Sequence, residues 1–184
     1  ENYAQVLSGV IDSLDEKKVY NQVLEQVTAA VEAKRPEIKE QVTAAVKEQV
    51  ETQVTAAVRA QVTEEVTAAV REQISEQVIL AVTGLSKADY EAAVKAGTIS
   101  QEVQDTVNST IETKMQSSDV QATIEAQVAA QMDKEEIKAS IKTATEAQMQ
   151  SETVQQTIAE QTDVQVKKAI SDTMASEDYN TSKN

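Results

Sequence analysis

A valine or isoleucine occupies every fourth position over a long stretch of this chain, from Ile38 to Val82. No glycine or proline lies between Pro36 and Gly84, and the intervening residues are mostly Glu, Gln, Ala, Lys and Arg, which favour helix. An even spacing also suits one face of a strand, but strands usually last only about five or six residues. The pattern therefore predicts a single helix of roughly 70 Å that begins near Pro36 and ends near Gly84.

A spacing of four residues is not the spacing of a coiled-coil seam. Each step of four advances the stripe by about 40° around the helix, whereas a left-handed two-stranded coil needs an average of about 3.5 residues per step. A neighbour on one fixed face would leave about half of the valines in water. We therefore expect most of them to be buried, by helices folded back from the last third of the chain or by another copy; the eight positions are Val42, Val46, Val50, Val54, Val58, Val62, Val66 and Val70.

The same stretch contains an internal repeat. The sextet QVTAAV occupies residues 41–46 and 53–58 and returns with glutamate in first place at 65–70, which is a period of twelve. An earlier copy occupies residues 26–31. A unit of twelve residues is only about three helical turns, so such repeats lengthen one helix and do not stack as solenoid units.

The flanking sequence divides into four further segments. Residues 1–35 carry apolar positions at helical spacing and predict two N-terminal helices, over 3–14 and 15–34. Residues 85–99 predict a short helix and a turn, with a start at Ser86 and an end at Gly97. Residues 100–176 predict several shorter helices, and the polar residues 177–184 predict a frayed tail.

Residues 100–176 also carry a repeated phrase. A serine followed by polar or acidic residues and then a Val/Ile pair opens at Ser100, Ser118 and Ser151, as expected for a helix N-cap and first turn. Asp133 with Glu136 resembles a capping box. The four methionines are expected to fill gaps in the core; they are Met115, Met132, Met149 and Met174. The predicted fold is all-α, elongated and coiled-coil-like, with one long central helix and shorter helices folded back.

Composition and charge narrow the possible functions. The chain has no Trp or Phe and only 2% aromatic residues, so its core is expected to be thin. With 17 basic against 31 acidic residues its net charge is −14, which disfavours nucleic acid as a partner. No apolar stretch of about twenty residues is present, so we expect no direct membrane insertion of this segment.

The sequence offers no recognisable chemistry. Histidine and cysteine are absent, which removes the usual nucleophile and base pairs as well as histidine and thiolate metal sites. No calcium loop, P-loop or dinucleotide-binding glycine motif occurs. Adjacent acids such as Glu64 and Glu65 point to different sides of a helix and are expected to be solvated. We therefore expect no enzyme activity, no catalytic residue, no metal and no cofactor.

Five phrases of the sequence resemble a known family. They are EQV at residues 48–50, QVTAAV at 53–58, LAVTGLSKADYEAAV at 80–94, KMQSSDVQ at 114–121 and EAQMQS at 146–151. These resemble the extracellular region of the YhgE/Pip (phage infection protein) family of membrane proteins of gut Firmicutes, from about Val27 onward. The resemblance implies a large outward-facing helical region between membrane segments that are not in this sequence. It also implies a location on the extracellular face of a Gram-positive cell membrane.

Two classes of function remain open at the level of sequence. The first is a non-catalytic cell-surface stalk or ectodomain that presents or spaces a recognition surface, with a phage-receptor or secretion-associated role and a phage protein as a partner. The second is a structural coiled-coil or interaction protein, secreted or cytosolic, that self-associates through its helices. The opening at Glu1 instead of Met suggests a processed product or an excised piece.

Overall fold

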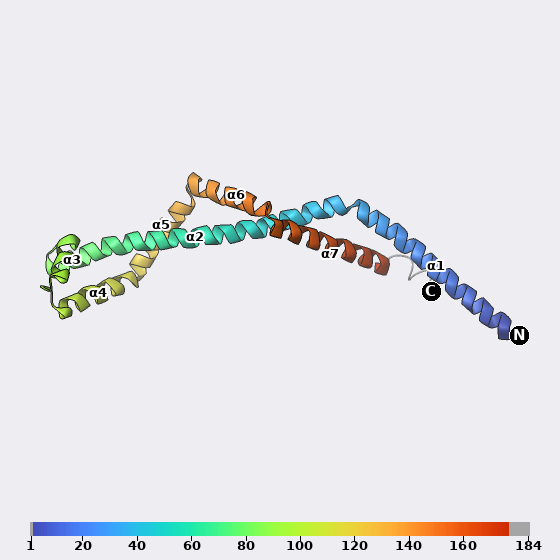
Figure 1. Ribbon diagram of the computed structural model, residues 1–184, viewed down its shortest axis with the longest axis horizontal. Coiled ribbons are helices and arrows are strands. Elements are labelled where there is room, and N and C mark those ends of the chain that lie inside the picture. The colour runs from blue at the N-terminus through green and yellow to red at the C-terminus, as the bar shows by residue number, and fades with distance from the viewer. Residues whose placement is uncertain (1, 177–184) are drawn as a thin grey trace. The chain divides into compact units, whose positions relative to one another are not determined.

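Every regular element in the described part of the chain is an α-helix. The structure is a computed structural model that describes residues 2–176, without the side chains of residues 2, 8, 11 and 12, so the tail predicted at 177–184 lies outside the described residues. The helices are α1 (Asn2–Ala33), α2 (Arg35–Thr83), α3 (Lys87–Lys95), α4 (Gln101–Met115), α5 (Ser118–Met132), α6 (Glu135–Met149) and α7 (Glu152–Ser176). The predicted all-α class, with a long central helix and shorter helices packed against it, is confirmed (Figure 1).

The long helix begins next to the predicted proline and ends next to the predicted glycine. α2 runs without interruption for 49 residues, about 74 Å at 1.5 Å per residue. Pro36 lies in its first turn, where the missing N–H is one that the helix could not use. Gly84 follows its last residue with a φ of 72°, a backbone conformation that a residue without Cβ adopts freely. Both predicted ends are correct to within one residue.

The prediction of two helices before Pro36 is wrong. Residues 3–14 and 15–34 belong to one helix, α1, which continues to Ala33. Ser13 and Asp15 are residues that often cap helices, but no glycine or proline follows Leu14 to stop the preceding turn. Without a terminator the main-chain hydrogen bonds continue, and α1 ends only at the turn before Arg35, where the Lys34 N–H donates to Val31 O at 2.9 Å.

The short helix α3 has the boundaries that its sequence predicts. The Ser86 hydroxyl accepts a hydrogen bond from the Asp89 N–H at 3.2 Å, which caps the N-terminus. At the other end Gly97 has a φ of 76°, its N–H donates to Val94 O, and the Thr98 N–H donates to Ala93 O. These two bonds form a Schellman motif, which ends α3 and turns the chain back.

The chain returns as three helices of 15 residues and a longer fourth one. α4, α5 and α6 are each separated from the next helix by two residues, so equivalent positions recur every 17 residues. The N-cap positions are Ser100, Ser117, Lys134 and Ser151. All three serine hydroxyls accept a hydrogen bond from the N–H three residues later, as the sequence predicts for Ser100 and Ser151. The second start is at Ser117, one residue before the predicted Ser118.

Each two-residue break is held by side chains that bridge the two helices. At the α4–α5 break the Ser117 hydroxyl donates to Lys114 O at 2.6 Å, and Gln121 Nε2 donates to Met115 O at 2.8 Å. Gln155 Nε2 makes the equivalent bond to Met149 O at 2.7 Å. These bonds satisfy carbonyl groups that a helix end leaves without partners, so the breaks are defined bends and not loose loops.

The break between α5 and α6 uses a different contact. Asp133 is the C-cap residue of α5 and not an N-cap, so the predicted capping box with Glu136 is wrong. The Asp133 carboxylate instead lies 3.4 Å from the Lys138 ammonium. Lys138 stands at the repeat position that glutamine holds at 121 and 155, so an ion pair replaces the amide bond there.

The described part of the chain forms two compact units, each built from distant segments. One comprises Glu1–Val50 with Glu146–Asn184, and the other is Glu51–Thr145. In the second unit, α4 and α5 run back along the C-terminal part of α2 (Figure 1), and their side chains form one apolar cluster with it. The cluster comprises Val62, Val66, Val70, Ile74, Val78, Ile79, Tyr90, Val107, Ile111, Met115, Ile124 and Val128.

In the first unit α1 packs against α7. Tyr20 and Leu24 of α1 lie beside Ile170 and Met174 of α7, and a groove between α2 and α7 is lined by Val42 and other side chains. The buried apolar residues of this unit include Val31, Val46, Val50, Ile158 and Val166. Three of the four methionines are buried and Met132 is half-buried, as expected for gap-filling side chains.

Candidate functional site

The eight valines predicted to pack form the interior of the fold. Seven of them are buried and Val58 is half-buried, in agreement with the expectation that most are covered. The cover comes from helices of the same chain, which is one of the two arrangements that the spacing allowed. These valines are therefore packing residues, and α2 has no free apolar face along residues 42–70.

Five exposed apolar side chains gather instead at the start of α1, those of Tyr3, Val6, Leu7, Val10 and Leu14. Val19, Leu80 and Val164 are also about half exposed or more, at separate places on α1, α2 and α7. Tyr3 is 91% exposed, and Leu7 and Leu14 are 61% and 60% exposed. Their spacing of three and four residues places them along one side of the helix. We call these five residues the α1 stripe.

The α1 stripe precedes the part of the same helix that another helix covers. Val23 and Val27 are half-buried and Val31 is buried, where α1 packs against α7. Because a helix of this kind normally buries its apolar side, an apolar stripe that stays exposed is a candidate interaction surface. The sequence identified these residues as apolar but gave no reason to expect them in water.

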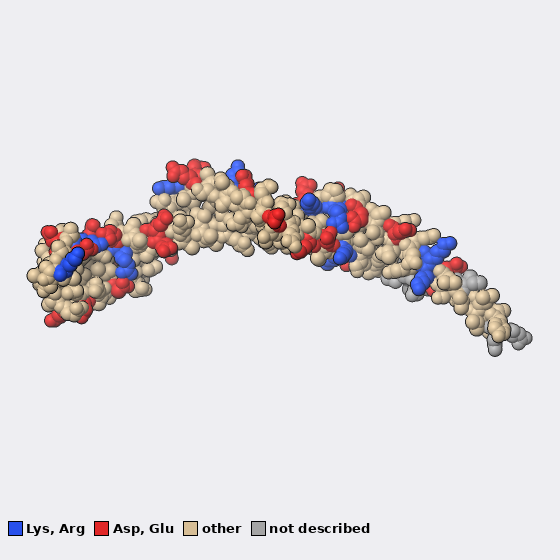
Figure 2. Space-filling view, in the orientation of Figure 1, with Lys and Arg blue, Asp and Glu red and all other residues tan. Residues whose placement is uncertain are grey.

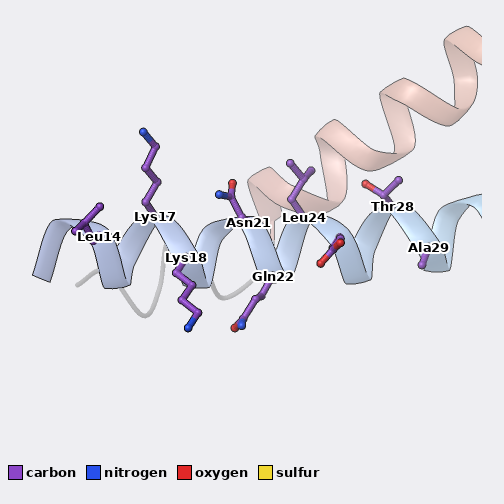
Figure 3. A pocket seen from close by; sticks show the side chains of 9 residues that line it. Leu14, Lys17, Lys18, Asn21, Gln22, Leu24, Thr28 and Ala29 are labelled. Carbon is purple, nitrogen blue, oxygen red and sulfur yellow. The ribbon is translucent and has the colours of Figure 1, made fainter. Parts of the chain in front are cut away.

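A shallow depression on α1 does not bring reactive groups together. Its lining residues lie between Leu14 and Ala29, all on this one helix. Figure 3 shows Lys17 and Asn21 on one side of α1, and Lys18 and Gln22 on the opposite side. Side chains that radiate from one helix cannot converge on a bound molecule, so the depression offers no preformed ligand site.

Ion pairs connect α2 to the helices around it. Arg71 Nη1 lies 2.6 Å from Glu112 Oε1 of α4, and Arg35 Nη1 lies 2.6 Å from Asp163 Oδ1 of α7. Lys87 of α3 pairs with Glu72 of α2. The hydrogen bond from Arg71 is the main reason why the pKa of Glu112 lies below its ordinary value.

Arg35 is held by two carboxylates. Besides Asp163 it contacts Glu32, whose Oε2 lies 2.7 Å from Arg35 Nε. The hydrogen bond to Glu32, followed by that to Asp163, raises the pKa of the guanidinium, and the same contact lowers the pKa of Glu32. All three groups are in contact with water, so these pairs orient the helices more than they stabilise them.

The charged side chains of the described residues offer no site for a metal ion. Among the described residues, no three acidic side chains are placed to hold a metal together. On the face drawn in Figure 2, Lys and Arg lie in small groups among Asp and Glu, and uncharged surface separates them. No described helix combines the length and the apolar character that a membrane span requires.

The charge pairs between helices were not predicted from the sequence, whereas the 17-residue repeat leaves a clear signal in it. The spacing of 17 between Met115, Met132 and Met149 is visible, and Val103, Val120, Ile137 and Val154 recur with the same period. No family model, curated protein or solved structure matches this chain.

Proposed function

We propose that this chain is a non-catalytic helical spacer that forms the outward-facing region of a cell-surface protein and holds a recognition surface at a distance. One observation carries the proposal: an uninterrupted helix of 49 residues has its valines covered by shorter helices of the same chain. A bare helix with this many valines would associate non-specifically, whereas covered valines give a helix that keeps its length without a partner.

The cell-surface location is supported by the resemblance of five phrases to the outward-facing region of YhgE/Pip membrane proteins. In that setting the partner is a protein, such as a phage protein or a component of a secretion system. The acidic surface favours such partners over nucleic acid, because phosphate groups would be repelled by a net charge of −14.

Antibodies raised against the purified chain test the location. They are applied to intact and to permeabilised cells of the source organism, with an antibody against a cytosolic protein as the control for leakage. Labelling of intact cells, and its loss after brief treatment with external protease, supports the proposal. Labelling that appears only after permeabilisation refutes the surface location.

A second function is favoured by the α1 stripe. Its exposed Leu7, Val10 and Leu14 suit a self-associating interaction protein, in which a second copy covers the stripe. Sedimentation velocity over a hundredfold range of concentration separates the two functions. A dimer that becomes a monomer in the variant Leu7→Ser with Leu14→Ser supports self-association. A monomer at every concentration in the parent chain refutes it.

A further inference from the structure

Two segments of the chain carry repeats with different periods: α2, and the returning chain from α4 to α7. On α2 a basic residue recurs every twelve residues, in step with the QVTAAV repeat. On the returning chain one column of the 17-residue repeat is mostly acidic. The basic positions are Arg35, Lys47, Arg59 and Arg71, and the acidic column is Glu112, Ala129, Glu146 and Asp163.

Two ion pairs show which basic position of α2 lies beside which acidic position of the returning chain. Arg71 contacts Glu112 in one compact unit, and Arg35 contacts Asp163 in the other, each at 2.6 Å. Arg35 and Arg71 are 36 residues apart, which is three repeats of twelve. Glu112 and Asp163 are 51 residues apart, which is three repeats of seventeen. Both pairs therefore obey one rule, in which twelve residues of α2 correspond to seventeen of the returning chain.

The helix geometry explains why the two numbers differ. Twelve residues of α2 advance by about 18 Å, whereas a 15-residue helix is about 22 Å long and must lie obliquely to advance equally far. Twelve residues at 100° each also turn the valine stripe by about 120°, so successive short helices must meet different sides of α2. A bend after every fifteen residues lets the returning chain follow the stripe.

We propose that twelve residues of α2 and seventeen residues of the returning chain form one structural module, and that the length of the protein is set by the number of modules. Each return helix supplies four inward positions spaced by four, as α2 does; in α4 they are Val103, Val107, Ile111 and Met115. Modules can then be added or removed without changing how the remaining helices pack. This inference is independent of the proposed cellular location.

The same rule sets the positions that correspond to the two remaining basic residues. Lys47 corresponds to Glu146, within one compact unit. Arg59 corresponds to Ala129, which has no charge, so this one position lacks its acid. Val58, next to Arg59, is the only one of the eight stripe valines that is not fully buried.

Removal of one complete module tests the rule. The deletion of residues 60–71 joins Arg59 to Glu72, and the deletion of 113–129 joins Glu112 to Ala130; both lie inside one compact unit. The double deletion should keep the parent's helicity per residue, measured by circular dichroism at 222 nm. It should unfold within about 5 °C of the parent chain, because every remaining inward position keeps a neighbour.

The two single deletions are the matched controls. Each removes one half of a module and leaves about four inward side chains of the other half without cover, so its Tm should fall by at least about 10 °C. The double deletion, although it removes more residues, should be the most stable of the three. A double deletion no more stable than either single one overturns the proposal.

A second test uses the position that lacks its acid. Ala129→Glu is made in the parent chain and in the variant Arg59→Ala, so that repulsion from Glu125 and Asp133 acts equally in both. Arg59 should make the change in Tm more favourable by about 1–3 °C, and 1 M NaCl should abolish the difference. Ala130→Glu, whose side chain points about 100° away, is the control and should be insensitive to Arg59. The assigned pairing is contradicted if Arg59 changes the effects of Ala129→Glu and Ala130→Glu equally, or changes neither.

Discussion

Two valines of α7 that are only two residues apart should differ in how much stability the same substitution removes. Val166 is 1% exposed, whereas Val164 is 60% exposed. Both lie well inside α7, so Val→Ala changes the helix propensity equally at the two positions. A comparison of Val166→Ala with Val164→Ala therefore isolates the contribution of burial.

The expected magnitude follows from the side-chain carbons that leave water. At Val166 the substitution removes two buried carbon groups, at about 0.8 kcal/mol each, and an incompletely filled cavity adds up to about 1 kcal/mol. Alanine has the better helix propensity, which stabilises the folded variant by about 0.6 kcal/mol. The net loss in the free energy of unfolding is therefore about 1–2 kcal/mol. At Val164 the smaller loss of burial and the gain in propensity nearly cancel.

Urea denaturation followed by circular dichroism at 222 nm measures both effects, since the chain has no tryptophan for fluorescence. The midpoint should fall clearly for Val166→Ala and remain near that of the parent chain for Val164→Ala. A similar loss of stability in both variants would refute the assignment of Val166 to the interior and of Val164 to the surface.

Three further predictions address other parts of the fold. Thr145 is 2% exposed and its hydroxyl has no hydrogen-bond partner, so Thr145→Val should raise the free energy of unfolding by about 1 kcal/mol. Thr162→Val should stabilise the protein less, because it loses a hydrogen bond to Ile158 O at 2.7 Å. Thermal melts that rank the two variants in the reverse order contradict this. Because the folded-state pKa of Glu112 is lowered, its pair with Arg71 contributes stability above the ordinary carboxyl pKa of 4.5, and this stability is lost on acidification. The parent chain should therefore have a slightly higher Tm than Glu112→Gln at pH 7, and the difference should disappear by pH 3. A difference that grows toward pH 3 contradicts this. A peptide of residues 38–82 should be poorly helical as a monomer, because valine is a weak helix former and its covering helices are missing; strong helicity that does not depend on concentration would count against this.

Helix identity and many helix ends were determined by the sequence alone. Pro36, Gly84 and Gly97 act on their own backbone, through a missing N–H or a positive φ, so their effect can be read without knowing any distant contact. The same holds for Ser86 and Ser100, which cap the helices that follow them. The valine stripe also required a covering of some kind, because apolar side chains at helical spacing are stable only when removed from water.

Other local signals were ambiguous, and the surrounding structure decided between them. Ser117 and Ser118 are equally good N-cap residues, but only Ser117 also reaches the Lys114 carbonyl of the preceding helix. Asp133 has the sequence context of an N-cap, yet α5 continues up to it. Such choices depend on where the previous helix stops, which is set by packing.

Only the tertiary structure determined which helices cover the valines and which apolar residues stay exposed. Glu112 lies 41 residues from Arg71 along the chain, and no local rule selects it from the other acids. Leu7 and Val31 belong to the same helix and are both apolar, but α7 packs against α1 and Val31 is buried, whereas Leu7 remains 61% exposed. Burial is a property of what another segment brings to a side chain, so a helical pattern predicts a face that needs a partner but does not identify that partner.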